Sequence, residues 1–458
     1  MKRTQVSLGF FWNTAAAAVI TAGCLGAAGC SGGDAGSGDT TGAGGQVSPG
    51  SGGASNAGTG GNTMGGHGDL ADAGSSAGGA GGTTGAGGSA TDAGSGGGSG
   101  IGGKTATGGM TGAGGMTGAG GMVTGAGGSP PVGPNPTTTT RALCTGTDPI
   151  ECHFGGNPGN YDVTVVLGGA AAGTTMVQAE RLRTMLAPVA TAAGQTARFT
   201  FTVNVRQPEG QPLEVVPAGT EGTPGLDVYF LGSNGQPPQL QAIGFAPATA
   251  PFMIYLGGDS TVCDQPTLDY GGWGQQLPQF FNYPVSIANY ADSGESSASF
   301  LASAALFGAI ESRLHTGDWV LLQFGHNDKT NTAQDFHDNM TAMVTRVKAK
   351  GAFPVVVSPV ARAQFNGTVV APQHINSTGA NLPMIAQQVA TEQNVPFLDM
   401  TARTIQWLML LGPNGWQQYH ALGTDVTHTN PAGALIEAGF LRDLIVQAKL
   451  TALTTRLR

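Results

Sequence analysis

Short apolar runs alternate with helical patterns along the chain from residue 250 to the C-terminus. Five runs have the length of buried strands, at 251–256, 284–289, 318–324, 352–358 and 395–398. The segments between them place apolar residues at helical spacing. Because strands that alternate with helices are typical of a doubly wound α/β domain, we predict a parallel sheet within residues 250–458.

Two of the predicted helices carry start signals. Thr332 can cap a helix with Asp335 three residues further on, and Asn430 followed by Pro431 can start the last helix. The apolar stripe predicted for the earlier helix contains Phe336, Met340, Met343, Val344 and Val347. The stripe predicted for the last helix contains Leu435, Ala438, Leu441, Ile445 and Ala448. We expect both stripes to face the protein core.

Residues 142–249 have a different pattern, with shorter apolar clusters separated by Gly, Pro and Asn. Three of these clusters, at 161–167, 197–203 and 226–231, read as strands. Their spacing predicts a small antiparallel β-sandwich domain. It would either bind sugar or only support the α/β part by packing, and we weigh the second role at least as highly because no aromatic cluster is evident.

Residues 30–141 contain little that a folded core could bury. Gly supplies 79 of the 458 residues, concentrated before position 130, and the segment ends in a Pro-rich piece at 130–136. We expect a disordered Gly-rich tether.

Residues 1–29 are typical of an export signal, because Lys2 and Arg3 precede an apolar stretch and small residues. Cys24 and Cys30 each follow Ala-Gly, as at the lipidation site of bacterial lipoproteins. We favour Cys30, with Cys24 as the alternative, because the tether begins directly after Cys30. The protein would then be extracytoplasmic, either a lipoprotein of the bacterial cell surface or outer membrane, or secreted.

Charge narrows the choice of partners. Charged residues make up 10 % of the chain and the net charge is −9, so we expect neither nucleic-acid binding nor membrane contact beyond an N-terminal lipid anchor. We expect a monomer. Cys144 and Cys152 are close enough in sequence for a small disulfide loop, which fits an oxidising compartment.

Polar motifs follow three of the predicted strands and precede the last helix. They are Gly-Asp-Ser-Thr at 258–261, Asp-Ser-Gly at 292–294, Gly-His-Asn-Asp at 325–328 and Asp-Val-Thr-His at 425–428. Since the carboxyl ends of parallel strands share one edge of a sheet, we expect these motifs to meet there. Gly-Asp-Ser alone is also an ordinary turn sequence.

In this order the motifs resemble the four blocks of the SGNH (GDSL-like) hydrolases. The neighbouring Gly-Trp-Gly at 272–274 and Thr-His-Thr-Asn at 427–430 are similar to the rhamnogalacturonan acetylesterase branch. The resemblance implies a three-layer α/β/α flavodoxin-like fold, an acetylated polysaccharide as substrate, and an esterase that needs no cofactor or metal.

Catalytic roles follow from the same resemblance. Ser260 would be the nucleophile and His428 its base, with Asp425 orienting the imidazole. The oxyanion hole would be formed by the backbone N–H groups of Ser260 and Gly294 and the side-chain amide of Asn327.

The remaining polar residues of the motifs have structural roles in our interpretation. Asp259 and Asp328 would hold the loops in shape. We considered a metal site at His326 and Asp328, but no third ligand is identifiable, which favours a structural histidine. Cys263 is a second candidate nucleophile, although no base lies beside it in sequence, so we prefer a buried, inert thiol.

The leading hypothesis is a serine esterase that removes O-acetyl groups from plant cell-wall polysaccharide, rhamnogalacturonan above all, through an acyl-enzyme. Glu295 occupies a place where many fungal relatives carry a basic residue, so specificity for an acidic polymer is an open question. The alternatives are a lipid-directed SGNH esterase or lysophospholipase, and a non-catalytic surface lipoprotein that binds glycans.

Overall fold

The computed structural model describes residues 138–206 and 224–458. The predicted signal peptide, both candidate lipidation cysteines and nearly all of the predicted tether lie outside these residues. The last four residues of the predicted tether, Thr138–Arg141, form the short helix α1. Arg141 Nε donates a hydrogen bond to Leu240 O at 3.3 Å, so this helix is attached to the β-strands that follow it.

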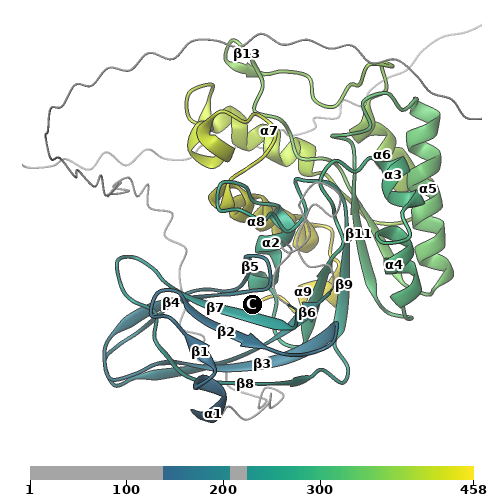
Figure 1. Ribbon diagram of the computed structural model, residues 1–458. Coiled ribbons are helices and arrows are strands. Elements are labelled where there is room, and N and C mark those ends of the chain that lie inside the picture. The colour runs from purple at the N-terminus through teal and green to yellow at the C-terminus, as the bar shows by residue number, and fades with distance from the viewer. Residues whose placement is uncertain (1–137, 207–223) are drawn as a thin grey trace, which may run out of the picture. The chain divides into compact units, whose positions relative to one another are not determined.

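Two antiparallel sheets occupy the part of the chain where a β-sandwich was predicted (Figure 1). The first has five strands in the order β1 (Cys144–Thr145), β2 (Ile150–Phe154), β7 (Leu226–Gly232), β4 (Gly173–Ala179) and β5 (Arg183–Thr191). The second has three strands in the order β6 (Thr196–Val205), β3 (Gly159–Gly168) and β8 (Leu240–Pro247). Side chains from both sheets share one hydrophobic core, because alternate residues of each strand point inward.

The two cysteines of the first strands pair as neighbours in the sheet. Cys144 and Cys152 lie opposite each other in the register of β1 and β2 and form a disulfide. Cys263 is a free, buried thiol. Burial raises the pKa of Cys263 well above its usual value, which keeps it protonated and agrees with the inert role we preferred.

A parallel five-stranded sheet forms the centre of the second part of the chain, as predicted. Its strands run in the order β10 (Val285–Asn289), β9 (Phe252–Gly257), β11 (Trp319–Gln323), β12 (Phe353–Val357) and β15 (Phe397–Leu398). Each lies within one residue of a predicted apolar run or inside it. A small hairpin, β13 (Phe365–Asn366) with β14 (Val369–Val370), projects from the segment after β12.

Helices cover both faces of this sheet, which gives the three-layer α/β/α arrangement (Figure 1). One face packs against α3 (Ser297–Ala302), α4 (Phe307–Arg313), α5 (Ala333–Ala349) and α6 (Leu382–Glu392). The other packs against α2 (Trp273–Gln276), α7 (Met400–Leu411), α8 (Pro431–Gln447) and α9 (Thr451–Thr454). Tyr255 belongs to the first core and Ile254 to the second, because successive strand residues point to opposite faces.

The predicted helix starts are confirmed, and one stripe needs correction. The Thr332 side chain and the Asp335 backbone N–H form a reciprocal capping box, and Asn430 caps α8. In α8, however, Leu435 is 39 % exposed and Ala448 is exposed. The other three predicted residues, Ala438, Leu441 and Ile445, are buried as expected. Gly433, Ala434 and Glu437 complete the buried side of α8, so the prediction is wrong only at the two ends of the stripe.

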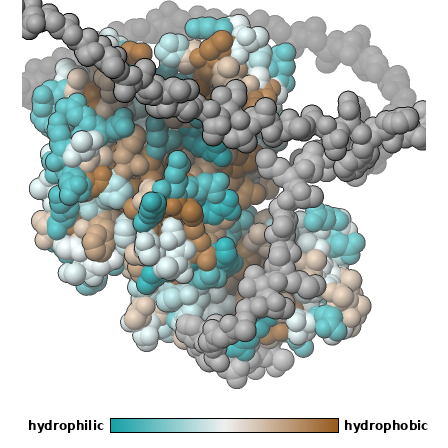
Figure 2. Space-filling model, turned by 180° about the vertical axis from the view of Figure 1, so that it is seen from behind, coloured by the Kyte–Doolittle hydropathy of each residue, from teal (hydrophilic) through white to brown (hydrophobic). Residues whose placement is uncertain are grey.

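The surface shown in Figure 2 carries hydrophilic residues interspersed with hydrophobic ones. Several large apolar side chains are exposed, including Leu268 and Leu410, which is ordinary for a protein surface when they are scattered. None of the described helices combines the length and the apolar character that crossing a bilayer requires.

Candidate active site

The turn after β9 presents Ser260 at the carboxyl edge of the sheet. Gly258 allows this turn, because a Cβ there would lie 2.6 Å from the Val262 side chain and 3.0 Å from the Gln323 carbonyl oxygen. Asp259 Oδ1 accepts hydrogen bonds from the Thr261 backbone N–H at 3.0 Å and the Thr261 hydroxyl at 2.7 Å. Ser260 itself is only 8 % exposed, so the turn holds its hydroxyl in one place.

The structure brings Ser260 together with two residues close to the C-terminus. Ser260 Oγ lies 2.8 Å from His428 Nε2, although 168 positions separate them. His428 Nδ1 lies 2.7 Å from Asp425 Oδ2. A carboxylate beside Nδ1 favours the tautomer with the proton on Nδ1, which leaves Nε2 free to accept the serine proton.

Asp425 also organises the loop that carries the histidine. Its Oδ1 accepts the backbone N–H groups of Thr427 at 2.8 Å and His428 at 3.0 Å. Burial opposes its charge, but the hydrogen bonds from His428 and Thr427 outweigh burial and hold the pKa of Asp425 below its usual value. This carboxylate is therefore ionised at neutral pH and can stabilise an imidazolium.

The loops of the expected oxyanion hole are tied to the nucleophile turn. The Asp292 backbone N–H donates to Gly258 O at 3.1 Å. Gly294 is exposed with φ +87°, a conformation that favours glycine, and a Cβ there would have open space around it. Asn327 Nδ2 donates one hydrogen bond to Glu295 O at 3.1 Å, so Asn327 and Gly294 lie on connected loops.

The carboxylates of Asp259 and Asp328 accept hydrogen bonds that fix the loops around the site, which is the structural role we predicted for them. Asp259 Oδ2 lies 3.2 Å from His326 Nδ1, and its contacts with His326 and Thr261 keep the pKa of Asp259 below its usual value despite complete burial. Asp328 Oδ1 accepts the backbone N–H and hydroxyl of Ser297 at 3.0 and 2.6 Å. Burial raises the pKa of Asp328. In the described part of the chain, no group of three or more His, Cys, Asp and Glu side chains could hold a metal ion.

Sequence reasoning missed a buried ion pair behind the nucleophile turn. Arg183, the first residue of β5, places Nε 2.6 Å from Asp264 Oδ2, and the two side chains are 1 % and 0 % exposed. Asn289 Nδ2 donates to Asp264 Oδ1 and to Val262 O, both at 2.9 Å. No local sequence pattern indicates this ion pair, because its two residues are 81 positions apart.

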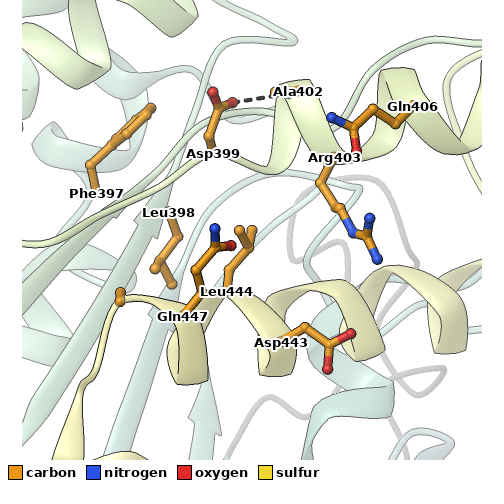
Figure 3. A pocket seen from close by; sticks show the side chains of 10 residues that line it. Phe397, Leu398, Asp399, Ala402, Arg403, Gln406, Asp443, Leu444 and Gln447 are labelled. Carbon is orange, nitrogen blue, oxygen red and sulfur yellow. Dashed lines mark hydrogen bonds between the residues drawn. The ribbon is translucent and has the colours of Figure 1, made fainter. Parts of the chain in front are cut away.

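A cavity of about 610 Å³ lies away from these groups, between the end of β15, α7 and α8 (Figure 3). Asp399, Arg403 and Gln406 line it from one side, and Asp443 and Gln447 line it from α8. The Asp399 carboxylate already accepts the Ala402 backbone N–H at 2.9 Å. None of the predicted site residues borders this cavity, so its size does not make it the reactive site.

Comparison with known proteins adds an independent line of evidence. Residues 257–436 match the profile of the GDSL-like Lipase/Acylhydrolase family. The chain is 35 % identical over 171 residues to the rhamnogalacturonan acetylesterase RhgT of Bacillus subtilis, covering 36 % of this chain and 71 % of RhgT. It is 28 % identical over 193 residues to the probable rhamnogalacturonan acetylesterase YesY of Bacillus subtilis, covering 40 % of this chain and 86 % of YesY. The crystal structure of YxiM from Bacillus subtilis aligns with 65 % of this chain and 80 % of that chain, with 24 % identity and a TM-score of 0.40.

Proposed function

Because the chain belongs to the GDSL-like lipase/acylhydrolase family and is a carboxylic ester hydrolase, we propose that it removes O-acetyl groups from rhamnogalacturonan. The observation that carries the proposal is the chain of contacts from Ser260 to His428 and Asp425, at 2.8 and 2.7 Å. The similarity to RhgT and YesY supports rhamnogalacturonan as the substrate.

The proposed reaction proceeds through an acetyl-enzyme. His428 Nε2 takes the hydroxyl proton of Ser260 as Oγ attacks the acetyl carbonyl carbon, and Asp425 stabilises the resulting imidazolium. When the bond to the sugar oxygen breaks, His428 returns the proton to that oxygen. Water then attacks the acetyl-serine with His428 as base, and acetate leaves while Ser260 regains its proton.

Negative charge on the carbonyl oxygen requires donors that are already in place. We assign this role to the backbone N–H groups of Ser260 and Gly294 and to Asn327 Nδ2. The Asn327 amide carries two protons and gives one to Glu295 O, so the second is available to the oxyanion. Each such donor typically contributes about 3 kcal/mol to transition-state stabilisation.

Export is part of the proposal. The disulfide between Cys144 and Cys152 supports an oxidising compartment. We propose that residues 1–29 direct export and that Cys30, or alternatively Cys24, carries a lipid anchor. Mass spectrometry of the mature N-terminus from the producing cell would test this, and an unprocessed N-terminus would contradict it.

Acetate release from acetylated rhamnogalacturonan tests the activity. We expect the full-length protein to release acetate, Ser260→Ala to lose roughly 10⁴-fold or more of kcat, and the exposed control Ser312→Ala to behave as wild type. Cys263→Ala should retain activity. If Cys263→Ala were inactive and Ser260→Ala were active, the thiol of Cys263 would be the nucleophile instead.

Two alternative functions predict different results, which ester assays and a binding assay distinguish. Faster turnover of long-chain than of acetyl p-nitrophenyl esters, without acetate release from polysaccharide, would favour a lipid-directed esterase. A protein that is inert on all esters but binds pectin in a pull-down would favour a non-catalytic glycan-binding lipoprotein.

A further inference from the structure

A cavity of about 220 Å³ adjoins the loop that carries Asn327. Its lining includes His326 and Lys329 from the loop after β11, and Arg362 and His374 from the segment after β12. The volume is below the ~300–1,000 Å³ of pockets for drug-sized ligands, so it suits one charged group or part of a sugar unit.

The cations of this cavity lack acidic partners within the described residues. Neither Lys329 nor Arg362 forms an ion pair there, and the Arg362 guanidinium donates from Nη2 to the backbone oxygen of His326 at 3.1 Å. Arg362 Nε and His326 Nε2 are buried and have no hydrogen-bond partner among the described residues. The carboxylate of Asp259 beside His326 Nδ1 favours the proton on that nitrogen, so Nε2 is an acceptor, and the Arg362 Nε–H is the donor that lacks an acceptor.

The electrostatic environment of the cavity is positive in a chain whose net charge is −9. Burial, together with the positive charges of His326 and Arg362, lowers the pKa of His374 to about 3. His374 is therefore neutral at working pH and avoids adding a further charge. Glu295, whose negative charge would oppose an acidic substrate, is not among the residues that line the cavity.

Hydrogen bonds between its walls hold the cavity open in one shape. Asn376 Nδ2 donates to Asp328 O and to Asn331 O, both at 2.8 Å. Ser377 Oγ donates to Lys329 O at 2.6 Å. The Arg362 backbone N–H donates to Gln373 Oε1 at 2.7 Å, so the backbones that carry both cations are fixed before any ligand binds.

The same walls contact the catalytic loops. His326 Nδ1 lies 3.2 Å from Asp259, the neighbour of Ser260. Ala363, the residue after Arg362, donates its backbone N–H to Val426 O at 2.7 Å, and Val426 lies in the loop between Asp425 and His428. The residues that form this cavity are therefore bonded to the loops that carry both Ser260 and His428.

We propose that this cavity is a subsite for a uronic acid carboxylate of the polysaccharide, recognised by Arg362 and Lys329. The Arg362 guanidinium lines the cavity and can donate to the paired oxygens of a carboxylate, and the exposed Lys329 ammonium adds a second positive charge. This inference rests on the proposed function, since it names the chemical class of sugar that the esterase site accepts.

Kinetics on a matched pair of polymers test the subsite. The substrates are acetylated rhamnogalacturonan and the same polymer after chemical reduction of its carboxyl groups, and the readout is the ratio of kcat/KM on the acidic to the reduced polymer. We expect Arg362→Gln and Lys329→Gln each to lower this ratio about tenfold or more, mainly through KM. The ratio for Arg362→Lys should lie between those of wild type and Arg362→Gln, because lysine keeps the positive charge and loses the paired hydrogen-bond geometry of the guanidinium.

Lys350→Gln is the control, because it removes one exposed positive charge at the end of α5, and its ratio should equal that of wild type. Salt should raise the wild-type KM on the acidic polymer more than that of either cavity variant. Unchanged ratios in both Lys329→Gln and Arg362→Gln would overturn the subsite while leaving the esterase intact. Failure of wild type to release acetate from either polymer would instead overturn the proposed function, and the subsite with it.

Discussion

Glu437 gives a prediction whose size follows from its burial. It lies on α8 and is 2 % exposed, with the Thr429 hydroxyl 3.4 Å from its Oε2 as a weak polar contact. Burial raises the pKa of Glu437 from 4.5 to about 8, and the charge of Asp259 acts in the same direction. The folded protein therefore holds this carboxyl protonated at neutral pH, whereas the unfolded chain does not.

The sign of the pH dependence follows from this difference. Below about pH 4.5 Glu437 is protonated in both states and does not oppose folding. Between 4.5 and about 8 only the folded state keeps the proton, so the free energy of unfolding falls by about 1.4 kcal/mol per pH unit from this group. Across the whole window the loss is roughly 5 kcal/mol. The Glu437→Gln variant has a neutral amide of similar shape and lacks this loss.

Urea unfolding of both proteins at pH 5.5, 6.5 and 7.5 measures the effect. The free energy of unfolding of Glu437→Gln minus that of wild type should rise by about 1.4 kcal/mol per unit, or roughly 3 kcal/mol over this range. Asp335→Asn is the control, because Asp335 is exposed and its pKa is lowered by hydrogen bonds from Thr332, which does not titrate, so its difference should stay flat. A difference for Glu437→Gln that is constant with pH would refute the reasoning.

Three further substitutions probe the site. Asp425→Asn should lower kcat on p-nitrophenyl acetate by roughly 10³ to 10⁴-fold with little change in KM, because it disturbs the tautomer and charge support of His428; a loss below tenfold would contradict the triad. Asn327→Ala should lower kcat by about 10²-fold through one lost oxyanion donor, and an unchanged kcat would remove Asn327 from the oxyanion hole. Arg183→Met removes the cation whose Nε lies 2.6 Å from the buried Asp264 carboxylate, so urea unfolding should show a loss of about 3–5 kcal/mol and kcat should fall as the nucleophile turn loosens. The double variant Arg183→Met/Asp264→Leu should regain much of that stability, and full stability of the single variant would show that the pair contributes nothing.

Local patterns in the sequence were sufficient for the elements that carry the site. The buried strand before Ser260 is an apolar run bounded by a polar turn, and the start of α8 is a cap followed by proline, so both depend on residues near one another in the chain. The parallel sheet then required its carboxyl ends to share an edge, and the family motifs indicated which residues gather there.

Long-range packing decided what those patterns could not. The predicted stripe of α8 is correct at Ala438, Leu441 and Ile445 and wrong at Leu435, which is exposed. Spacing alone does not fix the edges of a buried face, and only contact with the rest of the protein decides them. The pair of Arg183 and Asp264 joins segments 81 positions apart, and neither residue differs locally from an ordinary surface charge.

Composition predicts an exported tether, which stays a prediction. The short apolar runs were enough to separate a β-rich part from an α/β part, because each of these patterns depends on neighbours in sequence. The 2.8 Å approach of Ser260 to His428 and the positive cavity between Lys329 and Arg362 were decided by the tertiary structure alone. Their partners come from separate loops, and only the packing of helices on both faces of the sheet sets how those loops meet.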